Sequence, residues 1–284
     1  MNDRKAHVAE DRHSGGERPP RRTSSNAGNP RGGPRDRRGA PRSSGPDRAR
    51  RAQPRPGGDP GADQAGGPKI PAGIEAKQLA PEIRGELTTL DKATADYVAK
   101  HLVAAGELLE EDPEAALAHA RAARTRSGRI AAVREAVGIA AYHCGDWAQA
   151  LAELRAARRM GSRSPLLALI ADCERGVGRP ERAIELARSP EAEQLTGDDA
   201  DEFRIVVAGA RSDLGQFDQA LAFLASPPLD PKRTGQTAAR LFYAYAETLL
   251  ALDRSEEAVQ WFLHAAAADV EGVTDAEDRI TELG

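Results

Sequence analysis

The residues that could support nucleophilic or metal chemistry are two cysteines and one histidine. Cys144 and Cys173 lie 29 residues apart without a CxxC motif or a nearby pair of histidines, so they lack the spacing of a metal or redox site. His143 directly precedes Cys144, but neighbouring residues on a helix point about 100° apart, so no nucleophile and base are preassembled. We therefore expect both thiols to be small apolar fillers, and we expect no catalytic residue, no metal site and no cofactor.

Charged residues form two kinds of cluster. Acidic runs at 110–112 and 198–202 lie at the entries of expected helices, where carboxylates suit the positive end of the helix dipole, so we interpret them as caps and solvated faces. Residues 120–163 carry nine arginines against three acids, a net charge of +6. This basic stretch is either a solvated face or a contact for an anionic partner such as RNA. The candidates for that contact, near one face of a helix, are Arg155, Arg158 and Arg159.

The first 70 residues differ in composition from the rest of the chain. They hold 16 Lys and Arg against 8 Asp and Glu, a net charge of +8, whereas residues 71–284 have a net charge of −12. Gly and Pro fill 22 of the 70 positions and aromatic residues fill none. The segment has too little apolar surface to offset an ordering entropy of about 1 to 2 kcal/mol per residue, so residues 1–70 are expected to be a disordered tail. The tail is a solvated linker, a contact for RNA through its Arg-Gly-rich stretch at 29–42, or a contact for an acidic protein.

The remaining composition argues against several classes of protein. Two cysteines cannot build a disulfide framework for residues 71–284, and the longest apolar runs fall short of the roughly 20 residues that span a membrane. The N-terminus has no apolar run of a secretory signal. We expect a soluble, cytoplasmic protein with one domain over 71–284.

An internal repeat of about 34 residues runs through this domain. Each repeat has a turn, an acidic or amide pair, and then an alanine, and these alanines are spaced by 34, 33, 37 and 38 residues at Ala116, Ala150, Ala183, Ala220 and Ala258. A second small residue precedes each of them by 12 positions, at Ala104, Gly138, Ala171, Ala208 and Ala246. Small residues at these points would let two helices cross closely.

This register resembles the tetratricopeptide repeat (TPR) of bacterial proteins, over roughly residues 97–272. The resemblance implies an all-α fold, an α-solenoid of about five helix-turn-helix hairpins with a short capping helix. Caps and helix breakers place a first helix at 81–90 and the capping helix at 275–283. The expected hairpins are 93–110/113–126, 130–144/147–160, 165–177/180–189, 200–214/217–225 and 236–252/255–268, with residues 191–197 and 227–231 as spacers. No segment shows sustained alternation, so no strand is expected.

The resemblance also implies a concave groove lined by five positions of the first helix in each repeat. Counted along this sequence, those positions give the partner-binding candidates His101, Tyr142, His143, Asp172, Arg175, Tyr243 and Glu247, together with Leu108, Glu135, Ile139, Ile205, Asp213 and Arg240. Tyrosine and arginine are common anchors of interfaces. The alternative is that Tyr142 and Tyr243 pack within their own hairpins.

One specialisation of the family does not fit. TPR co-chaperones that grip a C-terminal carboxylate use lysine and asparagine at positions where this sequence has His101 and Ala105. We expect a non-catalytic protein-interaction module that binds a partner segment in its groove. The alternative is an RNA- or ribosome-associated protein that uses the basic tail and the arginines to contact phosphate, and an enzyme is a distant third.

Overall fold

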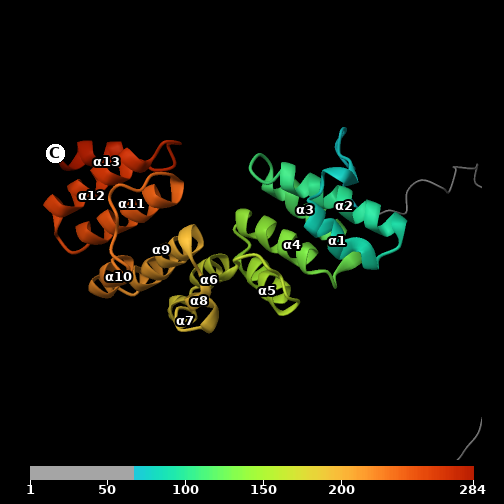
Figure 1. The fold of residues 1–284 in the computed structure, drawn as a ribbon, viewed down its shortest axis with the longest axis horizontal. Helices are drawn as coiled ribbons and strands as arrows, with labels where there is room; N and C mark the ends of the chain where they lie inside the picture. The colour runs from blue at the N-terminus through green and yellow to red at the C-terminus, as the bar shows by residue number, and fades with distance from the viewer. Residues whose placement is uncertain (1–66) are drawn as a thin grey trace, which may run out of the picture. The chain divides into compact units, whose positions relative to one another are not determined.

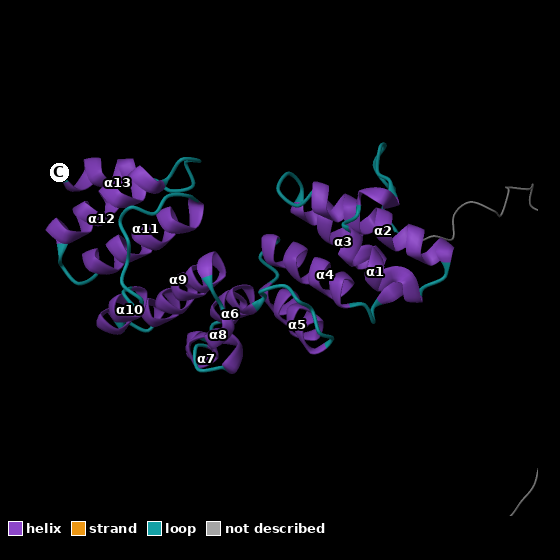
Figure 2. Ribbon diagram, viewed as in Figure 1, coloured by secondary structure: helices purple, strands orange, loops and turns teal. Residues whose placement is uncertain are grey.

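Five helical hairpins follow one another along the chain (Figure 1). The computed structural model describes residues 67–284, which lie in one compact unit, are largely helical and contain no strand (Figure 2). The hairpins are α2 (Lys92–Glu107) with α3 (Pro113–Ser127), α4 (Ala131–His143) with α5 (Trp147–Arg159), α6 (Leu167–Gly176) with α7 (Pro180–Leu186), α9 (Gly197–Asp213) with α10 (Phe217–Leu224), and α11 (Gln236–Leu250) with α12 (Ser255–Ala268). The capping helix α13 (Ala276–Leu283) packs against α12. The expected solenoid of five hairpins is confirmed. The expectation of a disordered tail at 1–70 falls almost entirely on residues 1–66, which lie outside the described residues.

The segment before the first hairpin closes the other end of the series. It contains η1 (Ala76–Gln78), α1 (Pro81–Glu86) and η2 (Leu87–Thr89), so the single helix expected at 81–90 is wrong in detail. The chain changes from α-helix to 3₁₀-helix where Leu87 turns inward and becomes almost fully buried. Leu87 joins Ile74 and Leu79 in a cluster with apolar residues of α2. These three side chains cover an apolar face of the first hairpin.

The third repeat departs from the expected boundaries. Its second helix ends at Leu186 instead of 189, and the spacer after it contains the short helix α8 (Pro190–Gln194). The Ser189 hydroxyl accepts a hydrogen bond from the backbone N–H of Ala192 at 3.3 Å, and Pro190 occupies the first helical turn. A serine cap followed by proline starts a new helix, which explains why the two helices are separate.

The ten small residues of the repeat are all buried within the hairpins. All five alanines of the second helices are fully buried, and Gly138 shows why the positions must be small. A Cβ at Gly138 would lie 2.7 Å from the Leu154 side chain and 3.1 Å from the Leu154 backbone nitrogen. The backbones of α4 and α5 are therefore too close for any side chain at this crossing.

The same turn joins the two helices in four of the five hairpins. One residue in each turn has a left-handed backbone, with φ between +59° and +76°, at Gly145, Gly178, Gly215 and Asp253. The next N–H donates to a carbonyl five residues back, with N···O distances of 2.8 to 3.0 Å, from Asp146 to Ala141, Arg179 to Glu174, Gln216 to Arg211 and Arg254 to Leu249. This is the hydrogen-bond pattern of a Schellman motif, which favours glycine at the left-handed residue.

The hairpins pack through consecutive contacts along the chain. The second helix of one hairpin contacts the first helix of the next, as α3 contacts α4 and α5 contacts α6. In the C-terminal half the first helices also contact one another, α6 with α9 and α9 with α11. Three first helices therefore lie side by side and present one surface.

Candidate functional site

A hydrogen-bonded chain of side chains crosses the first helices of three repeats. The Tyr142 hydroxyl, from α4, donates to Oδ2 of Asp172 on α6 at 2.6 Å. Arg175, also on α6, donates to Oδ1 of Asp172 at 2.9 Å and to both carboxylate oxygens of Asp213 on α9, at 2.8 and 3.2 Å. Burial and the bond to Asp172 raise the pKa of Tyr142, so its hydroxyl stays a donor at neutral pH. The structure brings together these four residues, which the sequence had placed separately at groove positions.

Arg175 can lie against α9 because the residue beneath it is a glycine. A Cβ at Gly209 would lie 2.8 Å from Cζ of Arg175. The missing side chain leaves room for the guanidinium on the helix surface, where Asp213 accepts two of its N–H groups. A bidentate arginine–carboxylate pair of this kind fixes the orientation of both side chains.

The surface beside Arg175 is hollowed between α9 and α11. Two adjoining pockets, of about 350 and 400 Å³, share Ile205 and Ala244 as lining residues. We call the combined hollow the α9–α11 trough, and its main lining residues are Arg175, Ile205, Gly209, Arg240, Tyr243, Ala244 and Glu247. The middle of the trough is apolar, and charged residues stand at both ends.

Two further groove candidates, Tyr243 and Glu247, line the trough from α11, Tyr243 in the part with Arg240 and Glu247 in the part with Arg175. The Tyr243 ring packs edge-on against Phe262, with ring centroids 5.3 Å apart, and burial together with Asp275 raises the pKa of its hydroxyl. Oε1 of Glu247 accepts a hydrogen bond from Nε of Arg279, on α13, at 2.9 Å, and Nη2 of the same guanidinium lies 2.8 Å from this oxygen in an ion pair. Tyr243 thus combines the two sequence interpretations, because it packs within its hairpin and also lines the trough.

His101 is placed inside the first hairpin and not on an open surface. Its side chain is 1% exposed, and its Nδ1 lies 2.9 Å from Nδ1 of His119 on α3. The expected groove position is lost because the backbone at Gly67 and the ring of Tyr97 lie beside it. Ala105, the second position of a carboxylate clamp, is also buried. No carboxylate could reach either residue without disrupting the hairpin.

His143 and Glu135 lie on α4, away from the trough. His143 is exposed at the end of the helix, with its ring centroid 6.0 Å from that of Tyr142. Glu135 accepts hydrogen bonds from the hydroxyls of Ser162 and Ser164, at 2.7 and 2.6 Å, in a separate cleft of about 830 Å³ bounded by α1 and the loop after α5.

The arginines of the basic stretch divide into paired and unpaired groups. Arg155 donates to Glu174 of α6, whose side chain is 1% exposed, so Arg155 neutralises a buried carboxylate and is not available to a partner. Arg124 and Arg134 neutralise the buried Glu153 in the same way. Arg158 and Arg159 are exposed and form no ion pair within residues 67–284.

Another buried ion pair was missed in the acidic run before the fourth hairpin. Asp201 is buried and accepts from Arg204 at 2.7 Å and from Arg233 at 2.5 Å. Arg204 also donates to the carbonyl of Pro227, at 2.9 Å. Asp201 is therefore neither a cap nor a solvated residue, since it ties the long loop before α11 to α9. Arg233 is 32 residues from Asp201 and Pro227 is 23 residues from Arg204, so a local pattern of charge does not reveal these two contacts.

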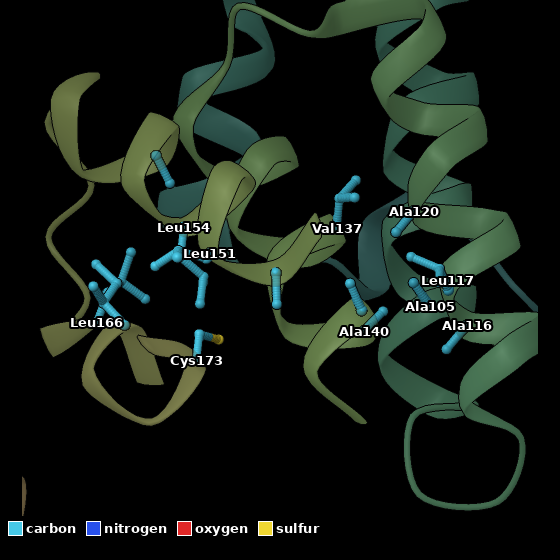
Figure 3. Packing of buried hydrophobic residues seen from close by; sticks show 14 residues of the cluster. Ala105, Ala116, Leu117, Ala120, Val137, Ala140, Leu151, Leu154, Leu166 and Cys173 are labelled. Carbon is cyan, nitrogen blue, oxygen red and sulfur yellow. The ribbon is translucent and has the colours of Figure 1, made fainter. Parts of the chain in front are cut away.

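The two cysteines behave as fillers. Cys173 is fully buried in a cluster that contains Leu151, Leu154 and Leu166 (Figure 3), and burial raises the pKa of its thiol to about 12. Burial also raises the pKa of the Cys144 thiol. Both shifts disfavour the nucleophilic thiolate. Among residues 67–284, no three His, Cys, Asp or Glu side chains are grouped as metal ligands, and none of the helices is long and apolar enough to cross a membrane.

Comparison with known families identifies the repeat. The family model described as Tetratrico peptide repeat matches residues 168–273, which include α9 and α11 and most of the residues that line the trough between them. Residues 168–273 are a TPR region. TPR hairpins serve as protein-interaction modules, so in general terms this region is one as well. The TPR register also extends to α2–α5, where the same small residues occupy the helix crossings.

The chain also resembles a solved structure at low sequence identity. The structure is that of YrrB, described as a TPR protein with an unusual peptide-binding site. It is 18% identical, with a TM-score of 0.42, and the match covers 64% of this chain and 91% of YrrB. A comparison with the curated proteins found no significant match.

Proposed function

We propose that this TPR protein binds an extended peptide segment of a partner in the α9–α11 trough, without catalysing a reaction. The observation that carries the proposal is the continuity of the trough across first helices, because Ile205 of α9 and Ala244 of α11 line both of its parts. An apolar middle can bury one or two side chains of a peptide, and polar groups at the ends can fix its direction.

The trough residues are already ordered before any ligand arrives. Asp172 and Asp213 hold the Arg175 side chain, and Tyr243 packs against Phe262. A surface whose side chains are held in place loses little conformational entropy when it binds. Tyr142 and Asp172 extend this ordered surface toward α4. The groove candidates Tyr142, Asp172, Arg175, Tyr243 and Glu247 are retained in this proposal, whereas His101 and His143 are not part of the trough.

The test is selection of peptides on the full chain, followed by affinity measurements with variants. Random 12-residue peptides are selected from a display library, and the best are measured by fluorescence anisotropy. Ile205→Ser combined with Tyr243→Ala should weaken them at least tenfold, while Leu263→Ser, which removes an exposed apolar side chain of α12, should change affinity less than twofold. Circular dichroism verifies that both variants are folded. Equal affinity for the trough variant and the control, or failure to select any peptide, would refute the proposal.

A second candidate function is contact with RNA. It is supported by Arg158 and Arg159, which are exposed on α5 without an intramolecular ion pair in the described part of the chain. Binding of the full chain to single-stranded RNA should then weaken with salt, by a slope of roughly −0.7 per phosphate contact. The double variant Arg158→Glu and Arg159→Glu should reduce the affinity for RNA. The double variant Arg84→Glu and Arg188→Glu is the control, because it changes the net charge by the same amount at other positions. Equal loss in both pairs would mean that only net charge matters. A cytoplasmic location also stays a prediction.

A further inference from the structure

Carboxylates outnumber arginines around the α9–α11 trough. At one end Arg175 is shared between two carboxylates, Asp172 and Asp213. Near the same end Arg279 is shared between Glu247 and Glu282. Each of these groups of three carries a net charge of −1.

The opposite end of the trough is also acidic. Arg240 pairs with Glu202 at 3.0 Å, and Asp275 lines the trough beside Tyr243. Burial raises the pKa of Glu202 although Arg240 opposes the shift, so this carboxylate is incompletely stabilised by its partner. The three arginines and six carboxylates around the trough have a net charge of −3.

Two of these carboxylates remain accessible to a ligand. The side chains of Asp213 and Glu247 are 41% and 39% exposed. Oε1 of Glu247 makes both contacts with Arg279, whereas its Oε2 accepts no hydrogen bond from the residues in 67–284. The acidic groups stand at the two ends, and the apolar Ile205 and Ala244 lie between them.

We infer that the partner segment is a basic peptide in which an apolar residue is flanked on both sides by lysine or arginine. The apolar side chain rests on Ile205 and Ala244, and the flanking cations contact Glu247 and Asp213 at one end and Asp275 at the other. Negative potential at both ends also repels acidic segments, which adds selectivity. This inference rests on the proposed peptide-binding function and specifies the chemistry of the partner.

The test uses three synthetic 15-residue peptides that share their apolar residues. One carries four lysines or arginines, one carries four aspartates or glutamates, and one carries serines at those positions. Binding to the full chain is measured by anisotropy at 50 and 300 mM NaCl. The basic peptide should bind at least tenfold more tightly than the other two at low salt, and its advantage should shrink at high salt because screening weakens the attraction.

Matched variants locate the effect. Asp213→Asn with Glu247→Gln should weaken the basic peptide at least fivefold, and Asp218→Asn with Glu256→Gln, which removes two exposed charges from second helices, should change its affinity less than twofold. If the acidic or neutral peptide binds as tightly as the basic one or more tightly, the basic-partner inference is refuted. If the Ile205→Ser and Tyr243→Ala double variant abolishes that binding, the trough remains the site. If no peptide of any class binds, the proposed function fails together with the inference. Equal effects of the two charge-variant pairs also overturn the inference, since overall charge would then explain the preference.

Discussion

The Nδ1 atoms of His101 and His119 lie 2.9 Å apart inside the first hairpin, with both side chains almost fully buried. One Nδ1 must carry a proton and donate it, and the other Nδ1 must be unprotonated and accept it. Protonation of both Nδ1 atoms would therefore break this hydrogen bond. The pair joins α2 to α3 next to the point where the described chain begins, at Gly67.

This pair makes stability depend on pH. Burial and the neighbouring His119 lower the pKa of His101 to about 4, and burial lowers that of His119. Since the unfolded chain, with a histidine pKa near 6.5, binds more protons than the folded one between about pH 6.5 and 4, stability should fall as pH falls through that window. His101 should contribute a loss of up to about 2 kcal/mol between pH 7.5 and 5.

Urea unfolding at several pH values measures this loss. His101→Gln should lower stability at pH 7.5 and flatten its dependence on pH between 7.5 and 5. His143→Gln, which changes an exposed histidine on α4, should leave the dependence unchanged. An unaltered pH profile in His101→Gln would mean that other groups produce the dependence.

Gly138→Ala should destabilise the protein by about 1 to 3 kcal/mol, because its Cβ would overlap Leu154 at the α4–α5 crossing. Gly106→Ala is the matched control, since Gly106 is helical and a Cβ there would meet nothing within 4 Å. That change should stabilise the protein by about 0.5 to 1 kcal/mol through helix propensity. Chemical denaturation gives both values, and a neutral Gly138→Ala would show that the crossing relaxes.

Asp253→Gly should stabilise the protein by about 0.5 to 1 kcal/mol. Asp253 is the left-handed residue of the last hairpin turn, with φ of 59°, where the other three turns of this type have glycine. Gly215→Asp makes the reverse change at an equivalent turn and should destabilise by a similar amount. Thermal unfolding compares the two variants, and shifts of equal sign would contradict this interpretation of the turn.

Arg155→Ala should cost about 1 to 3 kcal/mol, because it removes a partner of the buried Glu174 carboxylate and leaves only Arg179 beside it. Arg158→Ala, one turn further along the same exposed face, should change stability by less than about 0.5 kcal/mol. The free energy of unfolding from urea titrations decides between a structural and a surface role. Equally small effects of both substitutions would mean that Arg155 is a solvated surface residue, which is one of the two interpretations of the basic stretch.

Cys173 should resist thiol reagents until the protein unfolds, since its thiol is fully buried and its pKa is raised to about 12. Cys144, which is partly exposed, should react first. Labelling with a chromogenic disulfide at pH 8, using Cys144→Ser to isolate Cys173, gives the two rates. Rapid labelling of native Cys173 would indicate local opening of the third repeat.

The repeat was visible in the sequence because helix crossings impose a local rule. Ala104 and Ala116, or Gly138 and Ala150, are twelve residues apart because that spacing places one small residue on each helix of a hairpin at the crossing point. Each hairpin carries its own copy of the rule, so the number of hairpins and most of their boundaries could be predicted. The groove positions follow from the same register, which is why the sequence predicts Tyr142, Asp172 and Arg175 at neighbouring positions of successive first helices, where the structure joins them by hydrogen bonds.

The environment of each candidate depended on residues from other elements. His101 occupies a groove position by count, yet His119 of α3 and the backbone at Gly67 bury it. Arg155 is in a basic stretch by composition, yet Glu174 of the next hairpin engages it. Burial and ion pairing between hairpins depend on how the helices stack, and no local period encodes that stacking. Composition and periodicity determined the repeat and its register, whereas packing between repeats decided which polar side chains remain free to bind.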